Sequence, residues 1–177
     1  RSLDVLRDTA DKLFTEKASD LLKDPWDARN AYIKVVLENR PKIGPFFSAY
    51  GRKLKKSQRE LVLNLLEMQR NRMLMYTSCG WFFDEISGLE TVQVMMYSAR
   101  AMQLAFEISG LQLEETFLKL LERAPSNYFI YANGADVYRK LVKPVMIDSV
   151  RFGAHYAVSF LFRDYHDEDN VYCYRVS

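Results

Sequence analysis

Apolar positions recur along most of the chain with the spacing of an amphipathic helix. In the first segment leucine, alanine and phenylalanine repeat every three or four positions, from Leu3 through Phe14 to Leu22. A helix turns once every 3.6 residues, so such a stripe lies on one face and can be buried. The spacing predicts helices over residues 2–23, 26–39, 58–79, 91–108, 113–124, 135–141 and 144–162. The predicted fold is therefore all-α, a bundle of about six to seven helices.

Capping residues mark several of the predicted helix starts. Asp24 can cap a helix N-terminus, and Pro25 suits the first helical position. The S-x-x-E spacing of a capping box occurs at Ser57 with Glu60 and at Ser87 with Glu90. Residues 41–51, by contrast, contain two prolines and two glycines, so this stretch is predicted to be irregular.

The helix predicted over 91–108 is apolar on most of its circumference, which places it in the middle of the bundle. Ser109 and Gly110 end it. The C-terminal residues are not predicted to be helical, because the side-chain pattern of residues 171–176 is typical of a short strand. One strand cannot stand alone, so we expect it to belong to a sheet that continues beyond Ser177. Together with a start at Arg1 without an initiator methionine, this predicts a single helical domain over 1–177 that is part of a larger protein.

The connection between the helices at 58–79 and 91–108 carries unusual residues. Trp81, Phe82 and Phe83 stand directly before two carboxylates, Asp84 and Glu85, whereas connections are usually small and polar. We expect the rings either to plug a core or to line a pocket. Gly80 is predicted to end the preceding helix in a left-handed conformation. Arg72 could reach Asp84 or Glu85 and hold them ionised.

Composition and charge exclude several classes of function. The 177 residues suit one domain with a sizeable core, and 11 Tyr with 11 Phe but only 7 Gly and 5 Pro are typical of packed helices. The net charge is +2, from 25 basic and 23 acidic residues, which gives no general field for nucleic acid. One local exception is the basic patch at 52–56, which could touch a phosphate or an acidic neighbour or could be a solvated turn.

Cysteine and histidine provide no metal or cofactor signature. Cys79 and Cys173 are too few for a disulfide framework or a zinc site, and we expect both to be reduced in a cytoplasmic protein. His155 and His166 are isolated, so no metal and no cofactor are predicted. No apolar run is long enough to span a membrane, and charges interrupt the N-terminal segment where a signal peptide would be apolar.

A resemblance to a known family rests on three stretches. The run from Met75 to Glu90 followed by Tyr97-Ser98-Ala99-Arg100-Ala101, the segment Asp24-Pro25-Trp26-Asp27-Ala28-Arg29 with Tyr32, and Ala154-His155-Tyr156-Ala157 are similar to the C-terminal helical region of bacterial and archaeal proteins related to family 57 glycoside hydrolases. That region is a domain of unknown function attached to a catalytic barrel. The resemblance implies that the barrel lies N-terminal to this chain, is its partner, and holds the nucleophile and the general acid. No catalytic residue carries over.

Three hypotheses for function follow. In the first, the chain is an accessory domain that walls a glycan cleft, for example for an α-glucan, with Trp81 stacking on a pyranose, Asp84 and Glu85 contacting hydroxyls or the barrel, and Thr77, Ser78 and Arg72 in support. In the second, Asp84 and Glu85 form a catalytic acid/base pair. The third is a purely structural or assembly domain, whose rings are buried against the barrel or another subunit. A solvent-lined cleft at Trp81 favours the first, and burial of the rings within the domain favours the third.

Overall fold

Helices account for nearly all of the regular structure in the computed structural model, which describes residues 1–37, 43–147, 149–162, 170–171 and 174–175. The chain divides into two compact units, Arg1–Pro144 and Val145–Ser177. The first contains α1 (Ser2–Ala18), α2 (Pro25–Ala31), α3 (Ile33–Leu37), α4 (Ile43–Tyr50), α5 (Lys56–Leu74), the 3-10 helix η1 (Ser78–Trp81), α6 (Leu89–Ser109), α7 (Glu114–Leu121), α8 (Gly134–Val137) and the π-helix η2 (Tyr138–Val142). The 3-10 helix η3 (Lys143–Val145) spans the division. The second unit contains α9 (Ser149–Ser159) and the strands β1 (Asn170–Val171) and β2 (Tyr174–Arg175). The predicted all-α fold is confirmed.

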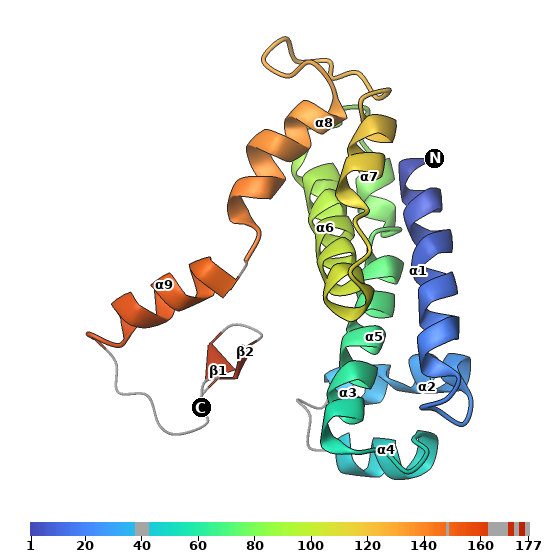
Figure 1. Ribbon diagram of the computed structural model, residues 1–177. Helices are drawn as coiled ribbons and strands as arrows, with labels where there is room; N and C mark the ends of the chain where they lie inside the picture. The colour runs from blue at the N-terminus through green and yellow to red at the C-terminus, as the bar shows by residue number, and fades with distance from the viewer. Residues whose placement is uncertain (38–42, 148, 163–169, 172–173, 176–177) are drawn as a thin grey trace. The chain divides into compact units, whose positions relative to one another are not determined.

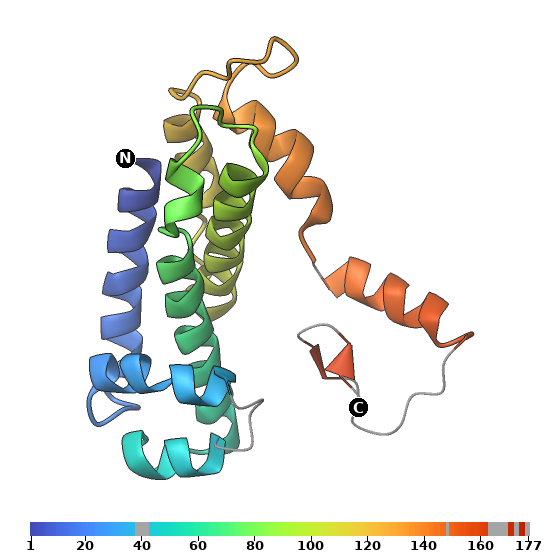
Figure 2. The ribbon, with the colours of Figure 1, turned by 180° about the vertical axis from the view of Figure 1, so that it is seen from behind.

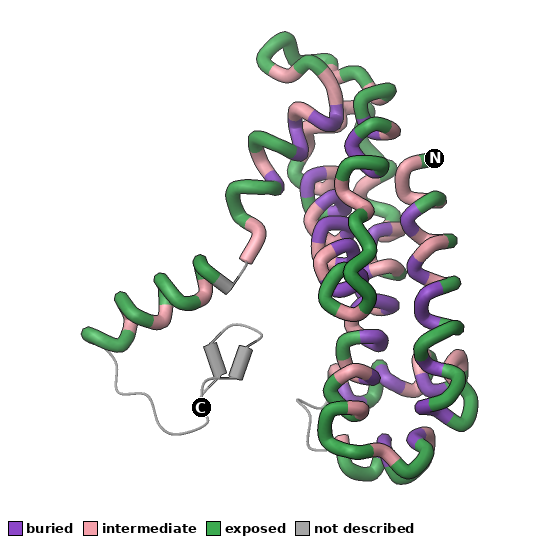
Figure 3. Tube along the Cα trace, viewed as in Figure 1, coloured by how far each residue is buried: buried purple, intermediate pink, exposed green. Residues whose placement is uncertain are grey.

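In the first unit α1, α5, α6 and α7 lie side by side, with α5 and α6 antiparallel neighbours (Figure 1). The short helices α2, α3 and α4 gather at one end of these long helices, and the connections α5–α6 and α7–α8 lie at the other, as the reverse view confirms (Figure 2). Buried positions on α1, α5 and α6 face inward, toward the neighbouring helices (Figure 3). This is the arrangement that an apolar stripe on each helix dictates.

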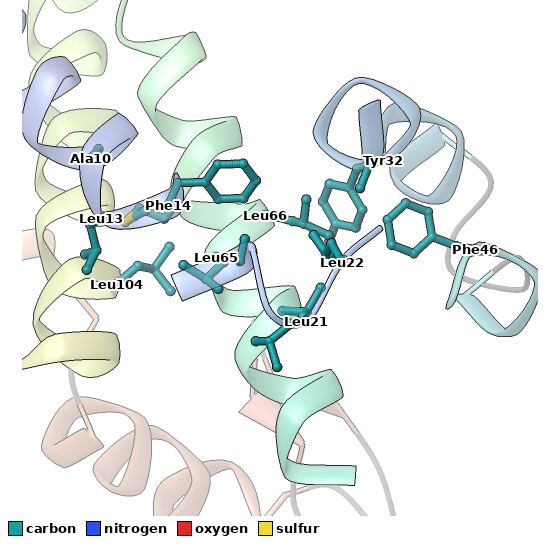
Figure 4. Close-up of a cluster of buried hydrophobic side chains, with 14 of the residues drawn as sticks. Ala10, Leu13, Phe14, Leu21, Leu22, Tyr32, Phe46, Leu65, Leu66 and Leu104 are labelled. Atoms are coloured by element: carbon teal, nitrogen blue, oxygen red, sulfur yellow. The ribbon is translucent and has the colours of Figure 1, made fainter. Parts of the chain in front are cut away.

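The main hydrophobic core joins the long helices to the short ones at one end. Leu13 of α1, Leu65 of α5 and Leu104 of α6 point toward one another, while Leu22, Tyr32 and Phe46 fill the space beside α5 (Figure 4). Burying a side chain of this size contributes about 1.5–3 kcal/mol. Phe14 and Trp26 meet edge to face at 5.3 Å between ring centroids, so Trp26 is a packing residue.

The predicted start of α2 is right, because a local cap defines it. Asp24 accepts a hydrogen bond from the Asp27 N–H at 2.9 Å, and Pro25 opens α2 as predicted. The helix predicted over 26–39 is instead divided into α2 and α3 after Ala31, and its residues 38 and 39 lie outside the described residues. The first helix ends at Ala18 and not at residue 23, because Leu21 and Leu22 are buried in the turn that follows it.

Two local predictions were wrong. Residues 43–50 of the stretch predicted to be irregular form α4, because Pro45 lies in the first turn of that helix, where a backbone N–H has no helical partner to lose. Residues 41 and 42 lie outside the described residues. The capping interaction of α5 also lies two residues before the predicted pair Ser57 and Glu60: the Lys55 N–H donates to Gln58 Oε1 at 2.9 Å.

The second unit differs from the prediction in its details. The helix predicted over 144–162 is interrupted, with η3 at its start and α9 beginning at Ser149. The structure has two short strands in the region of 171–176 where one was predicted. Asn170 pairs with Arg175, and Val171 with Tyr174, in an antiparallel ladder. Residues 172, 173 and 176 lie outside the described residues.

Candidate functional site

The connection between α5 and α6 contains the residues that the sequence singled out. After Leu74 the backbone turns twice, with the Tyr76 N–H donating to Met73 O and the Thr77 N–H donating to Leu74 O, and then forms η1. Thr77 precedes η1, Ser78 opens it, and Cys79 within it is exposed with a free thiol. Residues 82–88 complete the connection between η1 and α6.

Gly80 does not adopt the predicted left-handed conformation, since Gly110 after α6 is the positive-φ glycine of the described chain. Gly80 instead allows the backbone of η1 to lie close to α6. A Cβ at this position would stand 2.5 Å from Val94 Cγ2 and 3.6 Å from the Glu90 carbonyl oxygen. Thr91 Oγ1 also donates to Gly80 O at 3.4 Å. The glycine therefore lets η1 pack directly on the first turns of α6.

The three aromatic side chains of this connection are exposed and do not plug a core within the described chain. Trp81 is 62% exposed, Phe82 is 80% exposed and Phe83 is more than half exposed. Trp81 stacks on Tyr76 with ring centroids 6.4 Å apart and an angle of 16° between the planes, and Phe82 meets Phe83 edge to face at 5.1 Å. Each ring thus keeps a broad surface open to solvent.

Tyr76 anchors the Trp81 ring to the bundle. Its hydroxyl donates to Asp4 Oδ1 of α1 at 2.7 Å, and the Arg7 guanidinium lies 5.9 Å from the centre of its ring. Burial, followed by the hydrogen bond to Asp4, raises the pKa of Tyr76 to about 12. The ring beneath Trp81 therefore stays neutral and fixed over the physiological pH range.

Glu85 ties this connection to the α7–α8 connection. Its carboxylate accepts hydrogen bonds from the Ser126 hydroxyl and from the Asn127 N–H, both at 2.7 Å, while Asn127 Nδ2 donates to the Asp84 carbonyl oxygen at 2.9 Å. The Ser87 N–H donates to the same carboxylate at 2.8 Å. Hydrogen bonds from Ser87, Ser126 and Asn127 lower the pKa of Glu85 to about 2.

The capping box predicted at Ser87 with Glu90 was wrong. Gly88 is the residue that precedes α6, and glycine has no side chain with which to cap the helix. The Ser87 N–H is taken by Glu85, and the Gly88 N–H donates to the Glu85 carbonyl oxygen at 3.2 Å. The segment therefore turns around Glu85 before the helix begins.

Sequence reasoning did not single out the side chains of the α7–α8 connection, which add a second set of apolar groups at the same end of the bundle. Phe129 is 100% exposed, and Tyr128 and Ile130 are more than half exposed. The available signal was a run of four apolar residues, 128–131, between Pro125 and Gly134, in a place where polar residues are usual. We call Trp81, Phe82, Phe83, Tyr128, Phe129 and Ile130 the aromatic end.

Arg72 does not serve the loop as predicted. Its guanidinium pairs with the Asp11 carboxylate of α1 and does not hold Asp84 or Glu85. Gln69 Nε2 donates to the same carboxylate at 3.0 Å. Arg72 is therefore part of the α1–α5 packing. The Asp84 carboxylate, by contrast, is exposed and without a hydrogen-bond or ionic partner among the described residues.

The chemistry of the aromatic end suits binding better than catalysis. A general acid needs a raised pKa, whereas Glu85 is held ionised by three donors. In the described part of the chain, no three His, Cys, Asp or Glu side chains gather as a metal site would require. Among the described residues, no helix combines the length and the apolar character that crossing a membrane requires.

Comparison with known proteins identifies one family. No curated protein matches the chain, and no solved structure matches it either. The family described as "Domain of unknown function (DUF3536)" matches residues 1–177. Because this match covers the whole sequence, the chain belongs to that family.

Proposed function

We propose that the chain is a C-terminal accessory helical domain of a family 57-like glycoside hydrolase. The aromatic end contacts the catalytic barrel of the same polypeptide and walls its glycan cleft. The nucleophile and the general acid belong to the barrel, and this domain supplies position and binding surface. The protein acts in the cytoplasm on an α-glucan or another oligosaccharide. The resemblance of the stretches at 24–32, 75–101 and 154–157 is the basis for naming this enzyme class.

One observation supports a binding role for this end: exposed rings are held on two connections that are fastened to each other. Large apolar side chains in water are unfavourable and mark interaction surfaces when they cluster. Glu85 joins the two connections through Ser126 and Asn127, and Tyr76 fixes Trp81 to α1. A surface fixed before binding loses little conformational entropy on binding.

Within this surface Trp81 is the best candidate for contact with sugar. An indole offers a flat apolar face to the apolar face of a pyranose. The exposed Asp84 carboxylate can accept hydrogen bonds from sugar hydroxyls. Thr77 and Ser78 lie at the start of η1 and add hydroxyls nearby. Glu85 acts as a positioning residue, since its oxygens already accept hydrogen bonds from within the domain.

A second candidate function is a structural or assembly domain without a ligand site. Phe82, Phe83, Phe129 and Ile130 favour it, because these exposed side chains have no polar group to recognise a hydroxyl. Phenylalanine is enriched in the cores of protein interfaces. In this alternative the whole aromatic end, Trp81 included, is covered by the barrel.

A titration of the chain with α-glucan oligosaccharides distinguishes the two. Tryptophan fluorescence and amide chemical shifts are followed in the wild type, in Trp81→Ala and in the matched control Phe129→Ala. Trp26 remains as an internal signal, because its ring packs against Phe14 and Arg29. A saturable change that Trp81→Ala abolishes and Phe129→Ala keeps supports the glycan role.

The barrel contact is tested in the full polypeptide. Phe82→Ser with Phe129→Ser is expected to weaken glycan hydrolysis and to raise protease sensitivity between barrel and helical domain, because the aromatic end would lose its apolar contacts. If the titration shows no sugar response but the double variant weakens hydrolysis and raises protease sensitivity, the structural alternative is favoured. Unchanged activity and unchanged protease sensitivity, without a sugar response, would overturn both.

A further inference from the structure

A hollow lies at the end of the first unit that is opposite the aromatic end. The residues that line it come from the turn between α1 and α2, from α4 and from the start of α5. These segments lie at the same end of the unit (Figure 1). Its volume is about 630 Å³, which falls within the range of small-molecule sites. The lining residues are Lys23, Phe47, Ser48, Gly51, Arg52, Lys53, Leu54, Lys55 and Arg59.

Backbone hydrogen bonds between residues 21–23 and residues 50–52 fix the chain beside the hollow. The Lys23 N–H donates to Tyr50 O and the Arg52 N–H donates to Leu21 O, each at 2.9 Å, so that Leu22 and Gly51 form an isolated antiparallel bridge. A Cβ at position 51 would stand 2.7 Å from the Phe47 carbonyl oxygen, so the chain can pass here only as glycine. The hollow is therefore a built feature of the fold.

Positive charge dominates the lining. Lys23, Arg52, Lys53, Lys55 and Arg59 contribute cations, and the lining contains no carboxylate. Within the described residues none of these five forms an ion pair. The whole chain has a net charge of only +2, so this is a local concentration of uncompensated charge.

Several of the cations are oriented without being neutralised. Lys23 Nζ donates to Ala49 O at 2.7 Å and to Ser48 O at 3.2 Å, and Arg52 Nε donates to Leu22 O at 3.1 Å. The Arg59 guanidinium lies over the Phe47 ring at 5.5 Å. Backbone carbonyls and a ring hold these groups in place, while their full charges remain available to an anion.

The start of α5 adds to this field. A helix N-terminus is positive, and proteins commonly place Asp or Glu in the first turn. The first turn of α5 contains no acidic residue. The positive end of a 19-residue helix thus adds to the lysine and arginine charges and is not offset locally.

We propose that this hollow binds the phosphate group of a small phosphorylated molecule. Arginine and lysine together recognise a compact oxyanion, with arginine offering paired N–H donors and lysine a point charge. Phe47 and Leu54 provide an apolar wall for the rest of the ligand. Polymeric nucleic acid fits less well, because the low net charge provides no extended track.

Calorimetric titration of the chain with inorganic phosphate and with a hexose phosphate tests the site. The informative variant is Lys53→Gln with Lys55→Gln, because both side chains are exposed and make no hydrogen bond or ion pair within the described structure. Charged hydrogen bonds to phosphate predict affinity about tenfold weaker or more. The matched control Lys17→Gln with Arg123→Gln removes the same charge elsewhere and is expected to change affinity by less than about twofold.

Arg59→Gln provides a second variant, within α5 and not in the segment before it, and is also expected to weaken binding. Tighter binding of the hexose phosphate than of inorganic phosphate would show that the apolar wall takes part. Equal weakening in the control variant would mean general charge attraction and would overturn the proposal. The proposal would also be overturned if neither inorganic phosphate nor the hexose phosphate bound saturably. This holds even if an acidic peptide binds to the hollow.

Discussion

Glu85 illustrates how one side chain can organise two distant parts of the chain. Its carboxylate accepts hydrogen bonds from Ser87 beside it and from Ser126 and Asn127, about 40 residues further along. Asp84 next to it has an exposed carboxylate that makes no such contact within the described chain. Neighbouring carboxylates therefore have different tasks: Glu85 fixes the connections, and Asp84 is available to a ligand.

The Glu85→Gln variant should loosen this fastening and change its pH dependence. The wild-type pKa is lowered from 4.5 to about 2 in the folded chain, so the stabilisation is fully present above pH 4.5 and is lost as the pH falls toward 2. We expect faster amide exchange at Asn127 and Ser87 in the variant. Its urea midpoint should also fall less steeply than the wild-type midpoint over that pH window.

Asp84→Asn is the matched control for this experiment, since it removes the same charge from the neighbouring position. It should leave the amide exchange rates at Asn127 and Ser87 close to those of the wild type, because the Asp84 carboxylate does not take part in these hydrogen bonds. Equal behaviour of the two variants would contradict a special role for Glu85.

Gly80→Ala should destabilise the first unit by about 1–3 kcal/mol, because the added methyl group overlaps a buried and stiff neighbour, Val94. Urea unfolding measures the change. The double variant with Val94→Ala should lose less stability than the sum of the two single losses, since the smaller side chain makes room.

Gly44→Ala is the control for the Gly80 experiment. Nothing lies within 4 Å of its added Cβ in α4, and we expect the free energy of unfolding to rise by about 0.4–1 kcal/mol. Additive losses would show that Val94 does not restrict position 80.

At the scale of elements, α1 and α5 are joined by a polar contact as well as by apolar packing. The Asp11 carboxylate accepts from Arg72 and from Gln69, and both partners are largely removed from solvent. Asp11→Ala should therefore cost about 1–3 kcal/mol in the free energy of unfolding, because two donors lose their acceptor. Chemical denaturation compares it with Glu16→Gln on the same helix, whose partner Lys12 is exposed at 3.9 Å. The control should change stability by less than about 0.5 kcal/mol, and equal losses would refute the assignment.

The spacing of apolar residues predicted those helices whose signals lie within the helix or directly at its ends. The helix over 91–108 was found as α6 because its apolar residues and its terminal Gly110 are local signals. The Arg72 contact could not be found in this way, since its partner Asp11 is 61 residues away and Asp84 was the nearer acid in sequence. The helix at 43–50 was missed because Pro45 and Gly44 were interpreted as breakers, although a first turn tolerates both.

The sequence singled out residues of the connection between α5 and α6, but it did not show how the folded chain holds them. Trp81 and Asp84 were identified because aromatic and acidic residues are unusual in a connection. The hydrogen bonds of Glu85 to Ser126 and Asn127 join the second connection to the first, and the rings of both connections are exposed. Contacts between connections leave no periodic trace in a sequence, so only the folded chain reveals them.

At the scale of the whole molecule, the buried core and the exposed aromatic end are separated within the first unit. Phe14, Leu65 and Leu66 lie in the core with 0% of their surface exposed, whereas the aromatic end has large rings in solvent. A folded chain gains free energy from apolar area removed from water, so the rings at 81–83 and 128–130 contribute little to folding while they are uncovered. Their exposure fits the binding role proposed above, since a role in the folding core would require these rings to be buried.

This separation predicts opposite results for two phenylalanine truncations. Phe14→Ala removes a fully buried ring that meets Trp26, so the free energy of unfolding should fall by about 3–5 kcal/mol. Phe129→Ala removes a fully exposed ring and should change it by less than about 0.5 kcal/mol, although the surface available to a partner shrinks. Urea unfolding followed by circular dichroism measures both under the same conditions. A large loss in Phe129→Ala would mean that this ring is packed in solution, and the aromatic end would then be part of the core instead of a free surface.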